Sequence, residues 1–192
     1  QPHKKVSEAI RHGWEAVQQY PTERDRLQAL TDLAWSFVEA GDLSSAEDAC
    51  TVVAHRSEDF AYRTYALASM AYIEAARGDE TAFKIRIGTV DETPWRSGSP
   101  YMVSEVLLMR GQSYQMLGNH DPAMEWLERA KAFSHEHGVH QVTFKAEAAL
   151  ESLQTSGSSE TATPDAQTPT TLEGVAGVRD GLSSLRRELT LV

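Results

Sequence analysis

The sequence lacks the features that mark several classes of protein. It contains a single cysteine, Cys50, so no disulfide can form within the chain, and we predict that this residue lies in a helical core. No stretch approaches the roughly 18 to 20 uninterrupted apolar residues that a membrane-spanning helix needs. The first residues do not lead into the apolar run of a signal sequence. We therefore predict no membrane contact and a cytoplasmic location.

Positive charge is also scarce. Lysine and arginine number 18 against 28 aspartate and glutamate residues, which gives a formal net charge of -10 at pH 7. No basic stripe offsets this balance, and proteins bind nucleic acids largely through Lys and Arg contacts to phosphates. The composition therefore argues against a nucleic-acid partner for this chain.

Signatures of catalysis are missing as well. The sequence has no GxSxG, no phosphate-binding glycine loop and no HExxH, and its carboxylates are scattered as on a solvated face. The one histidine cluster, His135, His137 and His140, holds no i, i+4 pair and no added cysteine to complete a tetrahedral site. We therefore predict a protein that is not an enzyme, with no catalytic residue, no metal site and no cofactor.

What the sequence does contain is an internal repeat. Gly41, Gly78 and Gly118 occupy matching positions in three stretches that read LxxxAxxFxxxGxxxxAxxxC, LxxxAxxExxxGxxxxFxxxI and LxxxGxxYxxxGxxxxAxxxL. The glycines are 37 (41 to 78) and 40 (78 to 118) residues apart, which is close to the period of proteins built from repeated helix-turn-helix units. A repeat of this kind favours binding of other proteins over catalysis.

Hydrophobic periodicity predicts where the helices lie. In the first stretch, apolar residues such as Leu30 and Phe37 recur at spacings of three and four, which is typical of one helical face. Gly41 is expected to end that helix, and Asp42 or Ser44 to cap the next. The helices predicted in this way cover 23–40, 59–77, about 80–90 and 139–153.

The matching residues in these stretches point to a known family. In the third unit, large, small, aromatic, turn, small, large and small residues follow one another at Leu107, Gly111, Tyr114, Gly118, Ala123, Leu127 and Ala130. The first unit matches this order with Leu30, Ala34, Phe37, Gly41, Ala46, Cys50 and Val53. On these residues the chain resembles the tetratricopeptide repeat family, although Glu74 replaces the aromatic and Phe83 the small residue in the second unit. The resemblance implies a right-handed α-solenoid of antiparallel helix pairs.

The resemblance and the composition together predict the domain organisation. A repeat domain over 1–154 is followed by a flexible linker rich in Ser, Thr, Pro and Gly over 155–171 and by an amphipathic helix over 172–192. The repeat domain divides into a half repeat at 6–21, repeats at about 23–56, 59–90 and 101–137, and a capping helix at 139–154. A loop with Trp95 joins the second and third repeats. The half repeat and the start at Gln1 are expected of a piece of a longer protein with upstream domains.

The family resemblance also implies a binding surface. In this family the concave face is lined by the first helix of each pair, and none of the corresponding residues here is Lys, Arg or Asn, which argues against gripping a C-terminal carboxylate. Aromatic and methionine side chains with acidic edges favour an amphipathic segment with basic residues, whereas Trp35 and Tyr72 could instead pack between adjacent helices. The predicted groove residues are Gln28, Asp32, Trp35, Glu39, Tyr65, Ser69, Tyr72, Glu105, Met109, Gln112 and Met116.

The C-terminal segment has the pattern of a short amphipathic helix. Its apolar residues recur at three and four positions, the spacing of a coiled-coil seam, but they cover less than three heptads. Arg179, Arg186 and Arg187 give the helix positive edges that could meet the acidic groove. The predicted seam consists of Val175, Val178, Leu182, Leu185 and Leu189, followed by Val192.

The state of this segment stays open in the sequence. Gly174, Gly177 and Gly181 each lower helix propensity by roughly 1 kcal/mol, so a stabilising contact is needed for the helix to form. The segment either docks on its own repeat domain, pairs with another copy or partner, or stays disordered.

From these observations we expect a protein-interaction module that binds another protein or peptide, with self-association through the C-terminal helix as a further expectation. The alternative is a sensor or oligomerisation domain of a larger bacterial transcriptional regulator or signalling protein whose effector domain lies upstream. That alternative rests on family analogy, and fold alone does not give function.

Overall fold

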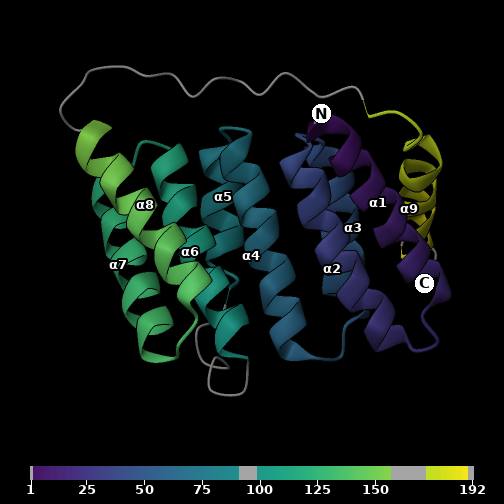
Figure 1. The fold of residues 1–192 in the computed structure, drawn as a ribbon, viewed down its shortest axis with the longest axis horizontal. Helices are drawn as coiled ribbons and strands as arrows, with labels where there is room; N and C mark the ends of the chain where they lie inside the picture. Colours follow the sequence, from purple (N-terminus) through teal and green to yellow (C-terminus); the bar gives the residue numbers. More distant parts are fainter. Residues whose placement is uncertain (1, 91–98, 157–171, 190–192) are drawn as a thin grey trace. The chain divides into compact units, whose positions relative to one another are not determined.

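The computed structural model of the chain describes residues 2–90, 99–156 and 172–189. Within these ranges it contains nine helices and no strand, so the predicted all-α class is confirmed (Figure 1). None of these helices is both long and apolar enough to cross a membrane. The chain divides into two compact units, one formed by Gln1–Ala66 with Ala166–Val192 and the other by Leu67–Asp165.

The first unit holds both ends of the described chain. It is built from α1 (Pro2–Gln19), α2 (Glu23–Glu39), α3 (Leu43–Arg56), the start of α4 (Phe60–Ala76), and α9 (Ala176–Glu188). α1 packs on α2 and α2 on α3, and the apolar stripe of α2 buries Leu33 and Phe37 in this core. A Cβ on Gly13 of α1 would lie 3.2 Å from Leu33 Cδ1, so a larger residue there would have to displace the Leu33 side chain slightly.

The second unit continues from α4 through α5 (Glu80–Ile87), α6 (Pro100–Met116), α7 (His120–Glu136) and α8 (His140–Ser156). α7 packs on α6, and α8 packs on both of them (Figure 1). Their apolar side chains form one cluster, in which Leu127 is fully buried. A Cβ on Gly111 would lie 2.7 Å from Leu127 Cγ, so α6 and α7 meet at a position where no side chain fits.

The same turn follows α2, α4 and α6. Gly41, Gly78 and Gly118 have φ angles of +75°, +76° and +72°, in the left-handed region that a Cβ disfavours. In each turn the glycine amide donates to the carbonyl three residues earlier, and the next amide donates to the carbonyl five residues earlier, at 2.9 to 3.0 Å. These bonds satisfy carbonyl groups that the helix end leaves without partners. The repeated glycines therefore mark turns with one backbone geometry.

Glu74 and Phe83, the two residues that depart from the repeat pattern in the second unit, make different kinds of contact. Arg86 of α5 donates to Glu74 Oε1 of α4 through Nε at 3.0 Å and Nη2 at 2.7 Å. Phe83 is fully buried, and its ring meets that of Tyr114 edge to face with centroids 5.0 Å apart. An ion pair and an aromatic pair thus occupy the positions where the other repeats place an aromatic and a small residue.

Several predicted boundaries differ from the structure by a few residues. α5 ends at Ile87 rather than near 90, and residues 88–90 form a turn instead. α8 runs to Ser156, two residues into the range predicted as linker. The predicted loop with Trp95, the rest of the linker and Val192 lie outside the described residues.

Candidate functional site

The predicted groove residues of α2 form a solvated row. Gln28, Asp32, Trp35 and Glu39, here called the α2 row, follow one another at spacings of four, three and four and so share one face of the helix. Gln28, Asp32 and Glu39 are exposed and Trp35 is half-buried. The helix begins at a capped end, because Thr22 Oγ1 accepts a hydrogen bond from the Asp25 amide at 3.1 Å. A regular helix therefore presents three polar side chains and one aromatic side chain together.

Asp32 is a perturbed carboxylate within this row. Much of the Asp32 residue is exposed, but its carboxyl group is partly buried, and this burial raises its pKa above the ordinary value. Burial raises the pKa of an acid because removal of water disfavours the charged form. The surroundings of Asp32 thus oppose its negative charge, and a cation beside it would favour that charge.

The groove residues predicted on α4 lie deeper. Tyr65 and Ser69 are buried, and Tyr72 is half-buried. Burial raises the pKa of the Tyr72 hydroxyl above its ordinary value. Ser69 Oγ lies 3.7 Å from the sulfur of Met109 on α6. Of these three side chains, only Tyr72 has substantial surface to offer a ligand.

The groove residues predicted on α6 are buried or half-buried in the second unit. Glu105 and Met109 are buried, whereas Gln112 and Met116 are half-buried. Lys145 Nζ of α8 donates to Glu105 Oε1 at 2.9 Å, so this carboxylate already has a cationic partner. The α2 row and Tyr65 belong to one unit and the other six groove residues to the other, so a groove shared by all of them stays a prediction.

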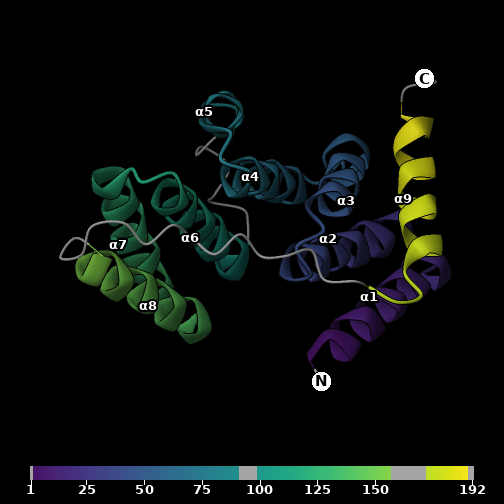
Figure 2. The ribbon, with the colours of Figure 1, turned by 90° about the horizontal axis from the view of Figure 1, so that it is seen from above.

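A second candidate site is the surface on which α9 docks. Of the three states that the sequence left open, the structure has the docked one, with α9 packed against α3 and α1 of its own chain (Figures 1 and 2). The predicted seam faces this contact: Val175, Val178 and Leu182 are buried, and Leu185 and Leu189 are half-buried. Leu172, which precedes α9, is buried with them.

α9 approaches α1 closely at Gly181. A Cβ at this position would lie 2.2 Å from Trp14 Cζ2 of α1, a distance that real side chains do not adopt. Gly177, one turn earlier, is exposed, and a Cβ added there would meet no atom within 4 Å. The low helix propensity at Gly181 therefore has a packing reason, while that at Gly177 has none in the described residues.

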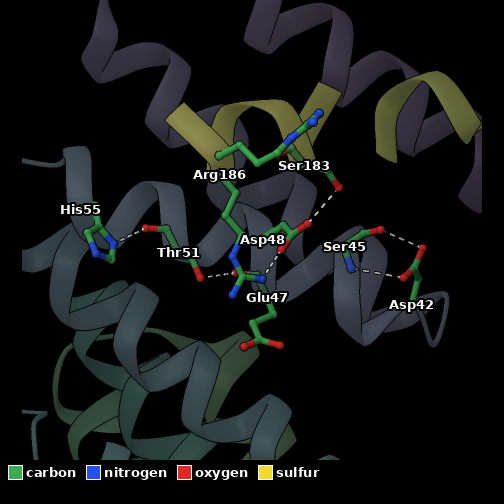
Figure 3. Close-up of polar contacts among 9 residues, drawn as sticks. Asp42, Ser45, Glu47, Asp48, Thr51, His55, Ser183 and Arg186 are labelled. Carbon is green, nitrogen blue, oxygen red and sulfur yellow. Dashed lines mark hydrogen bonds and ion pairs between the residues drawn. The ribbon is translucent and has the colours of Figure 1, made fainter. Parts of the chain in front are cut away.

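Charged pairs border the apolar contact. Arg179 Nε of α9 donates to Asp42 Oδ2 at 2.7 Å. Arg186 pairs with Asp48, and Ser183 Oγ donates to the same carboxylate at 3.2 Å (Figure 3). The hydrogen bond to Asp48 raises the pKa of the Arg186 guanidinium above its ordinary value.

The acidic partners are built into α3. Asp42 is its N-cap residue and accepts from the Ser45 amide at 3.2 Å and from Ser45 Oγ at 2.9 Å, as Figure 3 shows. The side chains of Asp42 and Asp48 are only 15% and 16% exposed, whereas those of Arg179 and Arg186 are 44% and 46% exposed. The carboxylates are thus fixed parts of the surface, and the arginines reach onto them from solvent.

The contacts of the tail arginines correct one expectation. Arg179 and Arg186 meet Asp42 and Asp48 of α3, not the carboxylates of the α2 row. In a further ion pair the base lies on α3 and the acid on α9, with Arg56 Nη2 2.6 Å from Glu188 Oε2.

Sequence reasoning did not assign Trp14, Asp42, Asp48 or Arg56 to a binding surface. One available signal was Gly181, because a glycine next to an apolar seam residue inside a helix indicates close approach of another element. The partner of that glycine is distant in the sequence, and no local pattern identifies it.

The histidine cluster shows no metal-site geometry. His137 Nδ1 lies 2.9 Å from the carbonyl oxygen of Phe133, and its ring stacks on that of Phe133 with centroids 4.0 Å apart. Across residues 2–90, 99–156 and 172–189, no group of three or more His, Cys, Asp or Glu side chains is placed to hold a metal ion.

Comparisons of the chain with protein-family models, with curated proteins and with solved structures found no match. The functions proposed for it therefore rest on the residues and contacts described above.

Proposed function

We propose that this chain is a protein-interaction module of the tetratricopeptide-repeat type, which binds a basic amphipathic helix or peptide of another protein. The observation that carries the proposal is the α2 row, with its exposed Gln28, Asp32 and Glu39 beside the half-buried Trp35. A cationic segment with an apolar face suits such a row, since the acids attract it and the aromatic ring supplies contact area.

The repeated turns support the assignment to this repeat type. Gly41, Gly78 and Gly118 share one backbone geometry, and each turn is followed by a new helix, as the family's helix pairs require. The small residues that follow the turns in the first and third units, Ala46 and Ala123, are fully buried, which suits close packing of paired helices. A solenoid of antiparallel pairs with a concave surface is the arrangement we propose from these features.

The raised pKa of Asp32 adds a specific reason for a basic ligand. Partial burial opposes its negative charge, and a ligand cation placed beside it would favour that charge again. We propose that Asp32 and Glu39 contact Lys or Arg side chains of the partner, and that Trp35 contacts its apolar face.

Selection of displayed peptides on the full chain tests this function. We expect the selected sequences to be basic and amphipathic, and to lose roughly tenfold or more in affinity for the Asp32→Arg/Glu39→Arg variant, because like charges then face each other. A matched control is Glu128→Arg/Glu136→Arg, which makes the same charge change at exposed positions of α7. If no sequence is enriched, or if both double variants bind the selected peptides equally, the proposed function is wrong.

A further inference from the structure

The surface that receives α9 is formed by helices with their own support. Here the α9-binding face means Trp14 of α1, Asp42 at the N-cap of α3, and Asp48 and Arg56 of α3. α2 packs on both α1 and α3, Thr22 caps α2 and Asp42 caps α3. None of these contacts involves α9. The face is therefore expected to keep its shape when α9 leaves.

The helix that occupies this face is, by contrast, weak by itself. Its N-cap residue, Val175, makes no side-chain capping bond, and its first turn holds no acidic residue. Gly177 lies in its first turn and Gly181 in its interior, and glycine disfavours helix formation. Although Arg186 and Arg187 favour its last turn, isolated helices of this length are marginal in water. α9 thus depends on the face for its helical state.

The contact defines the chemistry of a suitable ligand. It is an amphipathic helix whose apolar residues follow the spacing of Val175, Val178 and Leu182, all buried here. A glycine must stand opposite Trp14, where even a Cβ is too large. Basic residues must stand two positions before and five positions after that glycine, as Arg179 and Arg186 do, to meet the two carboxylates of α3.

We infer that the α9-binding face is an exchange site, at which an arginine-bearing amphipathic helix of another protein replaces α9. The charges of Asp42 and Asp48 select the arginines, and Trp14 selects the glycine. This site uses other residues than the α2 row, so it goes beyond the proposed function and can fail separately from it.

A foreign helix is favoured over α9 of a second copy. Covalent attachment gives the resident α9 a high effective concentration at its own face, which a separate chain lacks. A second copy's α9 makes the same contacts without that advantage. A foreign helix with a capped N-terminus and alanine at the exposed position of Gly177 gains helix stability that α9 lacks.

The test uses the full chain with a labelled peptide of residues 172–189 as the probe. Two variants open the site by changing α9 only: Gly181→Ala, which clashes with Trp14, and Val178→Asp, which places a charge in the apolar contact. Gly177→Ala is the matched control, because its new methyl group meets no atom within 4 Å. Fluorescence anisotropy gives the affinities, and hydrogen exchange of α1 to α3 reports whether the face stays folded.

We expect both opened variants to bind the probe roughly 100-fold more tightly than the unaltered chain, because they lose the in-chain competitor. The Gly177→Ala chain should bind the probe no better than the unaltered chain. Adding Asp48→Arg to either opened variant should abolish the gain, and a probe carrying Gly177→Ala should bind the opened variants more tightly than the unaltered probe does.

Three results would overturn the inference. Loss of exchange protection in α1 to α3 of both opened variants would make α9 a permanent part of the fold. Equal probe binding by opened and unaltered chains would show that the face is not the binding site. A concentration-dependent dimer of the unaltered chain in light scattering, abolished by Val178→Asp, would make the occupant a second copy. These outcomes do not depend on the proposed function. The Asp32→Arg/Glu39→Arg variant could leave binding of selected peptides unchanged without altering any of them.

Discussion

Gly111 and Gly181 each lie where two helices meet too closely for an added Cβ, and they belong to different kinds of interface. Gly111 brings α6 against α7 at Leu127, where a Cβ would meet the side chain at 2.7 Å and the backbone nitrogen at 3.0 Å. Gly181 brings α9 against Trp14 of α1, where the obstacle is one aromatic ring. The first contact joins neighbours in the sequence within a continuous apolar cluster, and the second joins segments from opposite ends of the chain.

The polar surroundings of the two glycines differ as well. The helices around Gly111 bury a single large cluster of apolar side chains. Beside Gly181 the apolar contact is bordered by ion pairs of half-exposed arginines, and such exposed pairs contribute about 0 to 1 kcal/mol each. We therefore assign the α6–α7 contact to the core of the second unit, and the α9 contact is the one that the proposed exchange requires to open.

The largest expected difference in unfolding free energy is between alanine variants of two fully buried leucines, one at each contact. Leu127→Ala should lower the free energy of unfolding by about 2 to 5 kcal/mol, since it leaves a cavity in the core of the second unit. Leu182→Ala removes the same side chain from α9 and should instead speed hydrogen exchange in α9 only. Denaturant unfolding and exchange measured on both variants check this, and a global loss of equal size in both would contradict the comparison.

A smaller effect is expected when Gly111 is replaced by alanine. The added methyl group meets Leu127 and the backbone behind it, and overpacking of this kind costs about 1 to 3 kcal/mol. The double variant Gly111→Ala/Leu127→Ala should recover part of the loss, because the smaller side chain makes room. Thermal unfolding of the single and double variants measures the coupling, and strict additivity would show that the two residues do not meet.

Gly177→Ala should act in the opposite direction on α9. Because the position is exposed and has no neighbour within 4 Å, alanine adds helix propensity without a clash, worth up to about 1 kcal/mol. Hydrogen exchange in α9 is expected to slow while exchange in α6 and α7 stays the same. Faster exchange in α9 would mean that Gly177 has a packing role.

The smallest effect concerns the charge of Asp32. Burial raises its pKa, so the folded state binds the Asp32 proton more tightly than the unfolded state does. The stability gained from this protonation is fully present below the unfolded pKa of about 3.9 and is lost as pH rises through the folded pKa. Asp32→Asn should therefore raise the unfolding temperature slightly near neutral pH and leave it unchanged in acid. Glu39→Gln, one turn from the half-buried Trp35, serves as the exposed control. A lower unfolding temperature for Asp32→Asn at neutral pH would contradict this sign.

The contrast between the two contacts also explains what the sequence could predict. Helix faces and the turns at Gly41, Gly78 and Gly118 depend on residues a few positions apart, and the repeat pattern located them correctly. The amphipathic pattern of α9 was likewise visible at Val175, Val178 and Leu182. The place where α9 docks was not, because the pair of Arg179 with Asp42 joins residues 137 positions apart.

The predicted groove residues divide along the same line. The exposed side chains of the α2 row follow from helical spacing alone, whereas burial of Tyr65, Glu105 and Met109 depends on packing that spacing does not specify. Glu105 shows why, since its acidic side chain would be expected at the surface but is buried against Lys145 of α8.

Hydrogen exchange of α9 in the full chain is the most direct test of the central claim, that α9 is a weak helix held by contacts with α1 and α3. In the unaltered chain α9 should be protected, but less than α6 and α7. In the Gly181→Ala variant, α9 should exchange at the rate of an unfolded peptide, while α1 to α3 and α6 to α8 keep their protection. Unchanged protection of α9 in that variant, or its loss throughout the chain, would contradict the claim.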